Sequence, residues 1–309
     1  MTSGLIRGSF VAGMIGVLAL FAGCVSQAGG GGGGGGNTNE NNVNDNNVNE
    51  NNVNDNNVND NNVNNNTNDN GTEPPLDGLL ADRTATAAFD TIPAGVFAQA
   101  KANLHVFYGH TSHGSQLVTG MNMLDTGPGS LDLEETGTDL GHEGDTGWAD
   151  ITRDRLDQPG HDINVVIWSW CGGVSDNTEA GINTYLTTMD ELEDDYPNVV
   201  FVYMTGHLDG SGEGGTLQAR NDQIRNYCRD HGKVLFDFAQ IESYDPDGNY
   251  YPDASDGCGW CTTWCASHEC PTGDCVNDSD CAHSHCFNCH QKGRAFWWLL
   301  ARLAGWEGE

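Results

Sequence analysis

Four short apolar runs between residues 100 and 240 constrain the fold of this chain more than any other feature. Each run is five to eight residues long and rich in β-branched and aromatic side chains, and the first three lead through a turn into a stretch with helical spacing. This alternation predicts parallel strands joined by crossover helices. The predicted strands are residues 104–108, 163–170, 199–204 and 234–238, and the predicted helices are residues 115–121, 178–195, 217–231 and 293–303. We therefore expect an α/β fold, a three-layer α/β/α sandwich around a mostly parallel sheet, with residues 104–108 as its first strand.

The N-terminus is typical of an exported protein. Arg7 precedes a short apolar region that ends at Phe-Ala-Gly-Cys, with Cys24 as the last residue. This ending resembles a bacterial lipoprotein signal, which places the signal peptide at residues 1–23 and makes Cys24 the lipidated residue; an ordinary signal peptide is the alternative. The expected location is the bacterial cell envelope or cell surface, with the lipid anchor as the only membrane contact.

Residues 24–75 are predicted to form a linker. They contain eight consecutive glycines and an asparagine-rich five-residue repeat whose only apolar member is valine. Such a composition has almost nothing to bury, so it predicts a disordered tether. The globular domain is expected at residues 76–309, with a cysteine-rich insertion at about 244–289.

The charge balance excludes some partners. Forty-four acidic residues against twelve basic ones give a formal net charge of −32, and the acidic excess extends through the globular part. Such a surface repels phosphate backbones and anionic headgroups, so nucleic acid is not an expected partner. The sequence does not indicate an oligomeric state.

A Gly-His-Thr-Ser-His-Gly segment at residues 109–114 follows the first predicted strand and precedes a predicted helix. Such a turn lies at the carboxyl edge of a parallel sheet, close to the free N–H groups that begin the helix. Ser112 is therefore a candidate nucleophile, and capping of the helix is its alternative role. A serine nucleophile needs an imidazole base oriented by a carboxylate, and Asp280 and His283 offer that pair near the C-terminus.

The order of these segments resembles the SGNH (GDSL-like) hydrolase superfamily, whose members are serine esterases, lipases and carbohydrate deacetylases on a three-layer α/β/α fold. The turn is similar to the branch with His-x-Ser-x-Gly in place of Gly-Asp-Ser, and the C-terminal segment matches the family's Asp-x-x-His. The resemblance implies a catalytic triad of Ser112, His283 and Asp280. It also implies an oxyanion hole, for which the candidates are Ser112, Gly144, Gly173 and Ser175. Ser175 stands where the family has asparagine.

The resemblance implies hydrolysis of an ester through an acyl-enzyme, with a small-molecule or glycan ester as substrate and carbohydrate O-acyl groups favoured. His110 and His207 are candidate substrate-binding residues, and His207 is also a rival base. Trp260 and Trp264 are candidates for stacking on sugar rings or for burial against disulfides. A non-catalytic carbohydrate-binding protein on the same fold is the alternative hypothesis.

Ten cysteines follow Cys24, and in an exported chain this density predicts disulfides of unknown connectivity. Cys171 and Cys228 lie outside the main cluster and are expected to pair with each other or with it. A four-thiolate zinc site from two Cys-x-x-Cys pairs is the competing interpretation. The disulfide candidates are Cys171, Cys228, Cys258, Cys261, Cys265, Cys270, Cys275, Cys281, Cys286 and Cys289.

The sequence contains two short segments that resemble cofactor-binding motifs, but we expect no cofactor. A Cys-x-x-Cys-His sequence made of Cys286, Cys289 and His290 could attach haem c, giving a monohaem protein as a second alternative function. Its place among many cysteines argues for a chance match. A loop with Asp245, Asp247, Asn249 and Asp253 has alternating oxygen ligands but lacks the EF-hand glycine and glutamate, so an acidic turn is favoured over calcium binding.

Overall fold

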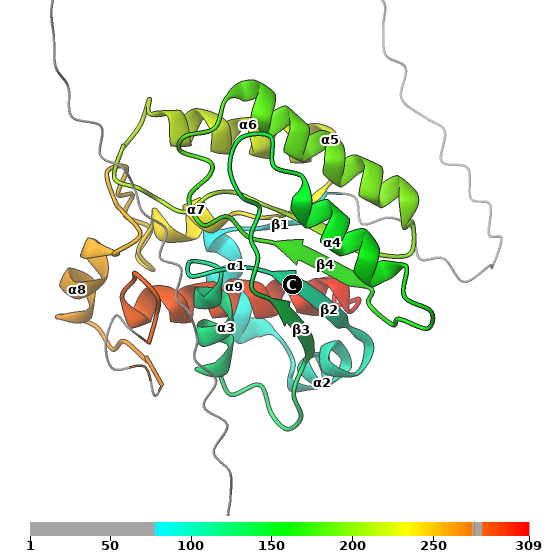
Figure 1. The fold of residues 1–309 in the computed structure, drawn as a ribbon. Helices are drawn as coiled ribbons and strands as arrows, with labels where there is room; N and C mark the ends of the chain where they lie inside the picture. Colours follow the sequence, from blue (N-terminus) through cyan, green and yellow to red (C-terminus); the bar gives the residue numbers. More distant parts are fainter. Residues whose placement is uncertain (1–77, 274, 276–279, 309) are drawn as a thin grey trace, which may run out of the picture. The chain divides into compact units, whose positions relative to one another are not determined.

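A computed structural model describes residues 78–273, 275 and 280–308 of the chain. The proposed signal peptide, the linker and Cys24 lie outside these described residues. A six-stranded parallel sheet with the order β1-β6-β5-β4-β2-β3 forms the centre (Figure 1). The strands are β1 (Leu80–Ala81), β2 (His105–Gly109), β3 (Asp132–Thr136), β4 (Val165–Trp168), β5 (Val200–Met204) and β6 (Val234–Phe236).

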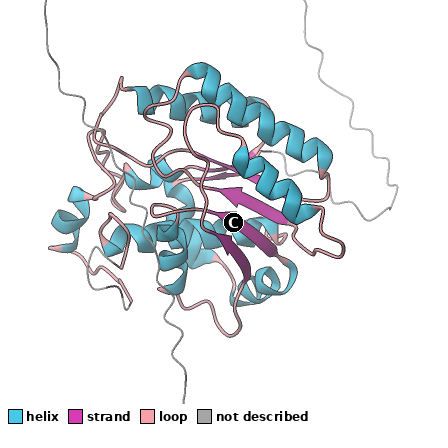
Figure 2. Ribbon diagram, in the orientation of Figure 1, coloured by secondary structure: helices cyan, strands magenta, loops and turns pink. Residues whose placement is uncertain are grey.

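Helices cover both faces of the sheet, so the expected three-layer α/β/α sandwich is confirmed (Figure 2). Helices α4, α5 and α6 lie over one face, and α1, α2, α3 and α9 lie on the other (Figure 1). The helices are α1 (Arg83–Ala88), η1 (Phe89–Thr91), α2 (Ala94–Asn103), α3 (Ser115–Asn122), α4 (Gly147–Leu156), α5 (Glu179–Asp195), α6 (Thr216–Asp230), α7 (Phe238–Glu242), α8 (Gly259–Cys265) and α9 (Cys286–Leu303).

The central strands form because their runs are apolar on both sides, as a sheet covered by two helical layers requires. Every residue of β4 and β6 is buried, and in β5 only the first residue is half-buried. All four predicted strands are present. The end of the last one differs: β6 stops at Phe236, because the Asp237 carboxylate caps α7 by accepting the Gln240 N–H at 3.1 Å.

Both edge strands were missed by sequence reasoning. The two-residue β1 precedes the strand that we expected to be first and pairs in parallel with β6. At the opposite edge, β3 is the acidic sequence Asp-Leu-Glu-Glu-Thr, and most of it is exposed. Charged residues on an edge strand discourage pairing with other chains, and they also hide the strand from a hydrophobic pattern.

Helix α9 begins seven residues earlier than predicted, at Cys286 rather than Gly293. The His285 side chain caps it by accepting the Phe287 N–H at 3.1 Å. Cysteines and polar residues fill its first two turns and are nearly all buried. The helical pattern was missed because buried cysteines behave as small hydrophobic residues without resembling an aliphatic stripe.

Two glycines let α3 and α9 pack with their backbones in contact. A Cβ placed on Gly120 would lie 1.8 Å from the Cys289 carbonyl oxygen, and one on Gly293 would lie 2.2 Å from the Gly120 carbonyl carbon. Only glycine permits this approach. The crossing joins the helix that follows the Ser112 turn to the helix that follows the His283 segment.

We expect Gly120→Ala to lower the free energy of unfolding by about 1–3 kcal/mol, because the added methyl group overpacks a contact between two backbones. Gly95→Ala on α2 is the matched control, since a Cβ there meets nothing within 4 Å. That control should stabilise the helix by about 0.5–1 kcal/mol. Urea unfolding of both variants measures the difference, and equal stabilities would contradict the packing argument.

The cysteine-rich insertion is held by disulfides, as predicted for this region. The bonded pairs are Cys258–Cys261, Cys265–Cys270, Cys275–Cys286 and Cys281–Cys289. Cys228 was wrongly included among the disulfide candidates: its thiol is free and buried on α6 within the apolar core. It therefore does not pair with Cys171.

Disulfides of this density are consistent with an extracytoplasmic protein. Within the described residues, no helix combines the length and the hydropathy that crossing a membrane requires.

Candidate active site

Ser112 lies at the point where the order of the sheet reverses. Strand β2 pairs with β3 on one side and with β4 on the other, and the chain continues from β3 back across β2 to β4. In open α/β sheets, ligands bind outside the carboxyl ends of the strands at such a reversal. The Ser112 hydroxyl lies 3.0 Å from the sulfur of Cys171, which follows β4. The candidate nucleophile, which follows β2, therefore contacts the loop that follows β4.

The turn that carries Ser112 is tightly held. The Tyr108 hydroxyl donates to the Gly114 carbonyl at 2.9 Å. A Cβ on Gly114 would lie 2.2 Å from the Ser169 Oγ and 2.4 Å from the His110 Cβ, so the close approach requires glycine. His110, a predicted substrate-binding residue, pairs through Nε2 with the Glu135 carboxylate at 2.8 Å. Its imidazole is thus engaged with β3.

The segment of Asp280 and His283 is attached to the nucleophile helix. The Gln116 side chain donates to the Ala282 carbonyl, and the Thr119 hydroxyl donates to the Asp280 carbonyl at 3.3 Å. The exposed His283, with φ +63°, stacks its ring on that of His113, with centroids 4.7 Å apart. The fold therefore brings two segments that are about 170 residues apart in sequence to one site.

The hydrogen bond that a catalytic base would make to Ser112 is not formed in this state. Among the described residues, the hydroxyl has its hydrogen bond with Cys171. A serine hydroxyl rotates readily, and catalytic hydrogen bonds are often completed only when substrate is bound. The roles of Ser112, His283 and Asp280 therefore stay predictions that the fold accommodates.

The oxyanion candidates lie in two neighbouring loops. Gly173 is buried and has φ +73°, and a Cβ on it would lie 2.1 Å from the Gly141 carbonyl oxygen. The loop after β3 therefore packs directly on the loop after β4, while Gly144 is exposed with open space around it. Ser175 is half-buried two residues after Gly173. The Asn177 side chain, which sequence reasoning missed, donates to the Gly173 carbonyl at 2.8 Å and fixes this loop.

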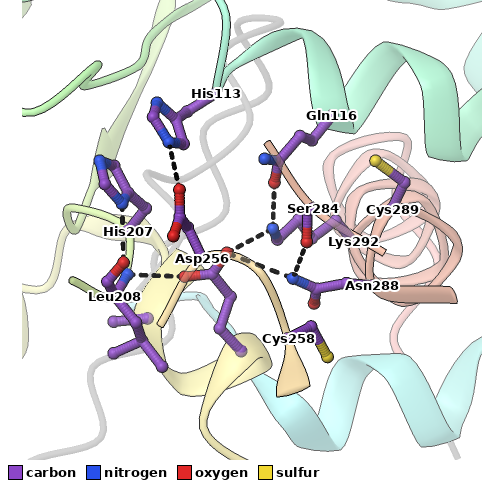
Figure 3. A network of polar contacts seen from close by, with 12 residues as sticks. His113, Gln116, His207, Leu208, Asp256, Cys258, Ser284, Asn288, Cys289 and Lys292 are labelled. Carbon is purple, nitrogen blue, oxygen red and sulfur yellow. Dashed lines mark hydrogen bonds and ion pairs between the residues drawn. The ribbon is translucent and has the colours of Figure 1, made fainter. Parts of the chain in front are cut away.

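A second group of titratable side chains lies beside Ser112. His113 Nε2 donates to the Asp256 carboxylate at 3.0 Å, and the rings of His113 and His207 stack with centroids 3.7 Å apart and an interplanar angle of 4° (Figure 3). Burial lowers the pKa of His113. Although burial alone would raise it, the hydrogen bond from His113 holds the pKa of Asp256 below its ordinary value. Sequence reasoning missed Asp256 because it lies in an insertion without a recognisable pattern.

A fully buried ion pair lies behind the site. Lys292 and Glu242 have no exposed side-chain surface, and their charged atoms are 2.5 Å apart. Lys292 also donates to the Gln116 side chain, and Glu242 accepts the Leu208 N–H at 2.7 Å. Figure 3 shows this network between α3, α9 and the loop after β5. It supports the His207 loop and, through Gln116, the segment that carries His283.

Comparison with known proteins adds little to what the structure shows. A crystal structure of a candidate acylhydrolase from Bacteroides fragilis superposes with a TM-score of 0.32 and 12% sequence identity, covering 48% of this chain and 74% of that chain. A superposition at this TM-score carries no argument about the fold or the reaction of this chain. No protein-family model matches the chain, and no curated protein matches it.

The rings of both candidate tryptophans, Trp260 and Trp264, stack on neighbouring side chains. Trp260 is buried, stacks on Tyr251 and donates to the Glu242 carbonyl at 2.8 Å. Trp264 stacks on both Phe287 and His268. These contacts support the interpretation of burial in the insertion rather than stacking on a sugar.

The residues of the two cofactor motifs have other partners. Cys286 and Cys289 are each bonded to another cysteine, so in this oxidised form neither sulfur is available for a haem thioether. The zinc interpretation requires thiolates, and all four of its cysteines are in disulfides. In the acidic loop, Asp245 accepts hydrogen bonds from Asn249 and Tyr251 of the same loop, as an acidic turn would.

Acidification should destabilise the protein. Burial lowers the pKa of both His113 and His290, so the unfolded chain binds these protons more tightly than the folded one. Their contribution to stability is complete above the unfolded pKa of about 6.5 and is lost as pH falls below it.

Urea unfolding between pH 7.5 and 5, with chelator present, should show stability falling with pH. His290→Asn should flatten this slope, whereas the control His142→Asn, at an exposed site, should leave it unchanged. Equal slopes in all three proteins would refute the expectation.

Proposed function

We propose that this protein is an exported, lipid-anchored serine hydrolase that cleaves an ester through an acyl-enzyme at Ser112. The observation that carries the proposal is the contact between two distant segments: the His283 ring stacks on His113, the residue next to Ser112. This contact supports a site in which Ser112, on its tight turn, and the His283 imidazole act together at the edge where open α/β sheets bind ligands.

In the proposed reaction, the Ser112 hydroxyl rotates away from Cys171 and attacks the ester carbonyl carbon. His283 accepts the hydroxyl proton and returns it to the departing alcohol, while Asp280 stabilises the imidazolium. Water then attacks the acyl-enzyme with His283 again as base and releases the acid. Backbone N–H groups of Ser112 and of the Gly144 or Gly173 loops would donate hydrogen bonds to the carbonyl oxygen as negative charge develops on it.

The substrate is proposed to be an uncharged ester, with O-acyl groups of carbohydrates as the favoured class. The net charge of −32 disfavours anionic substrates. A lipid anchor at Cys24 would hold the domain at the cell envelope, where acylated glycans are accessible.

A fluorophosphonate probe tests this proposal without knowledge of the natural substrate. The oxidised, folded protein is incubated with the probe, and the adduct is located by peptide mass spectrometry. We expect the label on Ser112, and we expect His283→Ala to remove it. Absence of labelling from correctly oxidised protein would overturn the proposal and favour a non-catalytic binding protein.

A further inference from the structure

Three side chains from different parts of the fold converge beside Ser112 in a way that the proposed hydrolysis does not use. They are His113 from the turn after β2, His207 from the loop after β5, and Asp256 from the cysteine-rich insertion. One ring nitrogen of each histidine and one carboxylate oxygen of Asp256 lie within 4.8 Å of one another. We propose that these residues bind a divalent transition-metal ion of the zinc type.

The donor set fits such an ion. Two imidazoles and one carboxylate are common zinc ligands, and a site with three protein ligands keeps a fourth position open for water or substrate. Bonds to zinc are about 2.0–2.2 Å long, so ligands around one ion lie roughly 3.3 Å apart, and binding would draw together ligand atoms that now lie within 4.8 Å of one another. His113 is buried, and Asp256 and His207 are half-buried, so the site is shielded without being closed.

The stacking of the two histidine rings disfavours the state in which both are imidazolium ions. Two imidazolium ions could not face each other at a centroid separation of 3.7 Å without strong repulsion. Neutral imidazole is the form that binds a metal. His113 now donates its Nε2 proton to Asp256, and metal binding at Nε2 would move that proton to Nδ1, which lies 3.4 Å from the Cys171 sulfur.

The surrounding hydrogen bonds orient two of the three ligands. His207 Nδ1 donates to the Leu208 carbonyl at 2.9 Å, so in a neutral ring Nε2 is the nitrogen that has the lone pair. The Asp256 N–H donates to the same carbonyl at 3.0 Å. Leu208 is itself held by the buried Glu242 through its N–H at 2.7 Å. Metal-binding histidines typically donate their second N–H to such an anchored acceptor.

The chain offers a matched control at another place. His105, Asp132 and Asp162 also bring their ligand atoms within 4.8 Å of one another, but both carboxylates are exposed. These residues lie at or just before the amino ends of β2, β3 and β4, whereas Ser112 lies beyond the carboxyl end of β2. This exposed group has one imidazole and two carboxylates instead of two imidazoles and one carboxylate, and it tests whether any close group of such side chains binds the ion.

The experiment titrates the full-length, disulfide-intact, metal-stripped protein with Zn²⁺ by calorimetry and with Co²⁺ by visible absorption. We expect one equivalent to bind with micromolar or tighter affinity, and Co²⁺ to show the intense bands of a tetrahedral site. His207→Ala and Asp256→Asn should each weaken binding at least about 100-fold, more than loss of an outer partner does. His105→Ala should bind as the wild type does.

Asp256→Asn keeps the shape of the side chain and its ability to accept from His113, so near-ultraviolet circular dichroism of this variant separates loss of a ligand from loss of the fold. Loss of the bound equivalent in His105→Ala, unchanged binding in Asp256→Asn, or no binding to the folded wild type would each overturn the proposal. Fluorophosphonate labelling of Ser112 is scored separately on the metal-stripped protein, so this inference and the proposed hydrolase function can fail independently.

Discussion

Ser112→Ala should reduce hydrolysis of an activated ester such as p-nitrophenyl acetate by about 10³-fold or more, because no acyl-enzyme can form without the hydroxyl. The fold should survive, since among the described residues the hydrogen bond lost with the hydroxyl is a weak one to a sulfur. Initial rates at saturating substrate measure the effect.

Ser115→Ala is the matched control for this change. Ser115 lies one helical turn along, and its hydroxyl donates to the Ser112 carbonyl at 2.6 Å, so it shares the environment but points back to the backbone. We expect this variant to keep most of the activity. Full activity in Ser112→Ala, or equal losses in both variants, would show that Ser112 is not the nucleophile.

Lys292→Met should lower the free energy of unfolding by about 3–5 kcal/mol, the largest stability effect that we expect for a single side chain. The reason is the Glu242 carboxylate, which has no exposed surface and would lose its counter-charge. Burial lowers the pKa of Lys292, and the attraction and hydrogen bond of Glu242 oppose that effect, so the charged lysine depends on its partner. For a domain of this size the melting temperature should fall on the order of 10 °C.

Two variants test this explanation. Lys233→Met removes an ammonium whose partners Asp190 and Glu193 keep contact with water, at 45% and 26% exposure, so it should lose only about 1 kcal/mol. Replacing both charges, in Lys292→Met with Glu242→Leu, should be milder than Lys292→Met alone, because no charge is left unpaired. A double variant as unstable as the single one would contradict the argument and point to the shapes of the side chains instead.

The central part of the fold was predictable because its strands carry their own signal. Runs such as residues 199–204 are β-branched and aromatic along their whole length, as a sheet covered on both faces requires. The strand β3 was not predictable, because at an edge the solvent permits an acidic sequence. Helix α9 was only half predicted, since its first turns owe their burial to disulfides and to the crossing with α3 rather than to an aliphatic pattern.

The residues of the candidate site also divide into those that could be predicted from the sequence and those that could not. The turn with Ser112 was recognisable because strand, glycine and helix follow one another locally. Asp256 was not, because its partner His113 is 143 residues away and nothing in the sequence between them indicates the contact. The free Cys228 was also not predictable. An even number of cysteines suggests that all of them are paired, but a cysteine buried in the core can remain a free thiol because it packs as a small hydrophobic residue.

The connectivity of two disulfides has a consequence for how the protein is made. The bonds Cys275–Cys286 and Cys281–Cys289 interleave along the chain, so neither joins cysteines that are neighbours in the order of synthesis. An oxidase acting on each cysteine as it emerges from a translocation channel would first join Cys275 to Cys281 and Cys286 to Cys289. Because Cys281 lies within the segment that carries His283, we expect correct assembly of the site to need a thiol isomerase that exchanges those early bonds. A host without one should yield inactive protein.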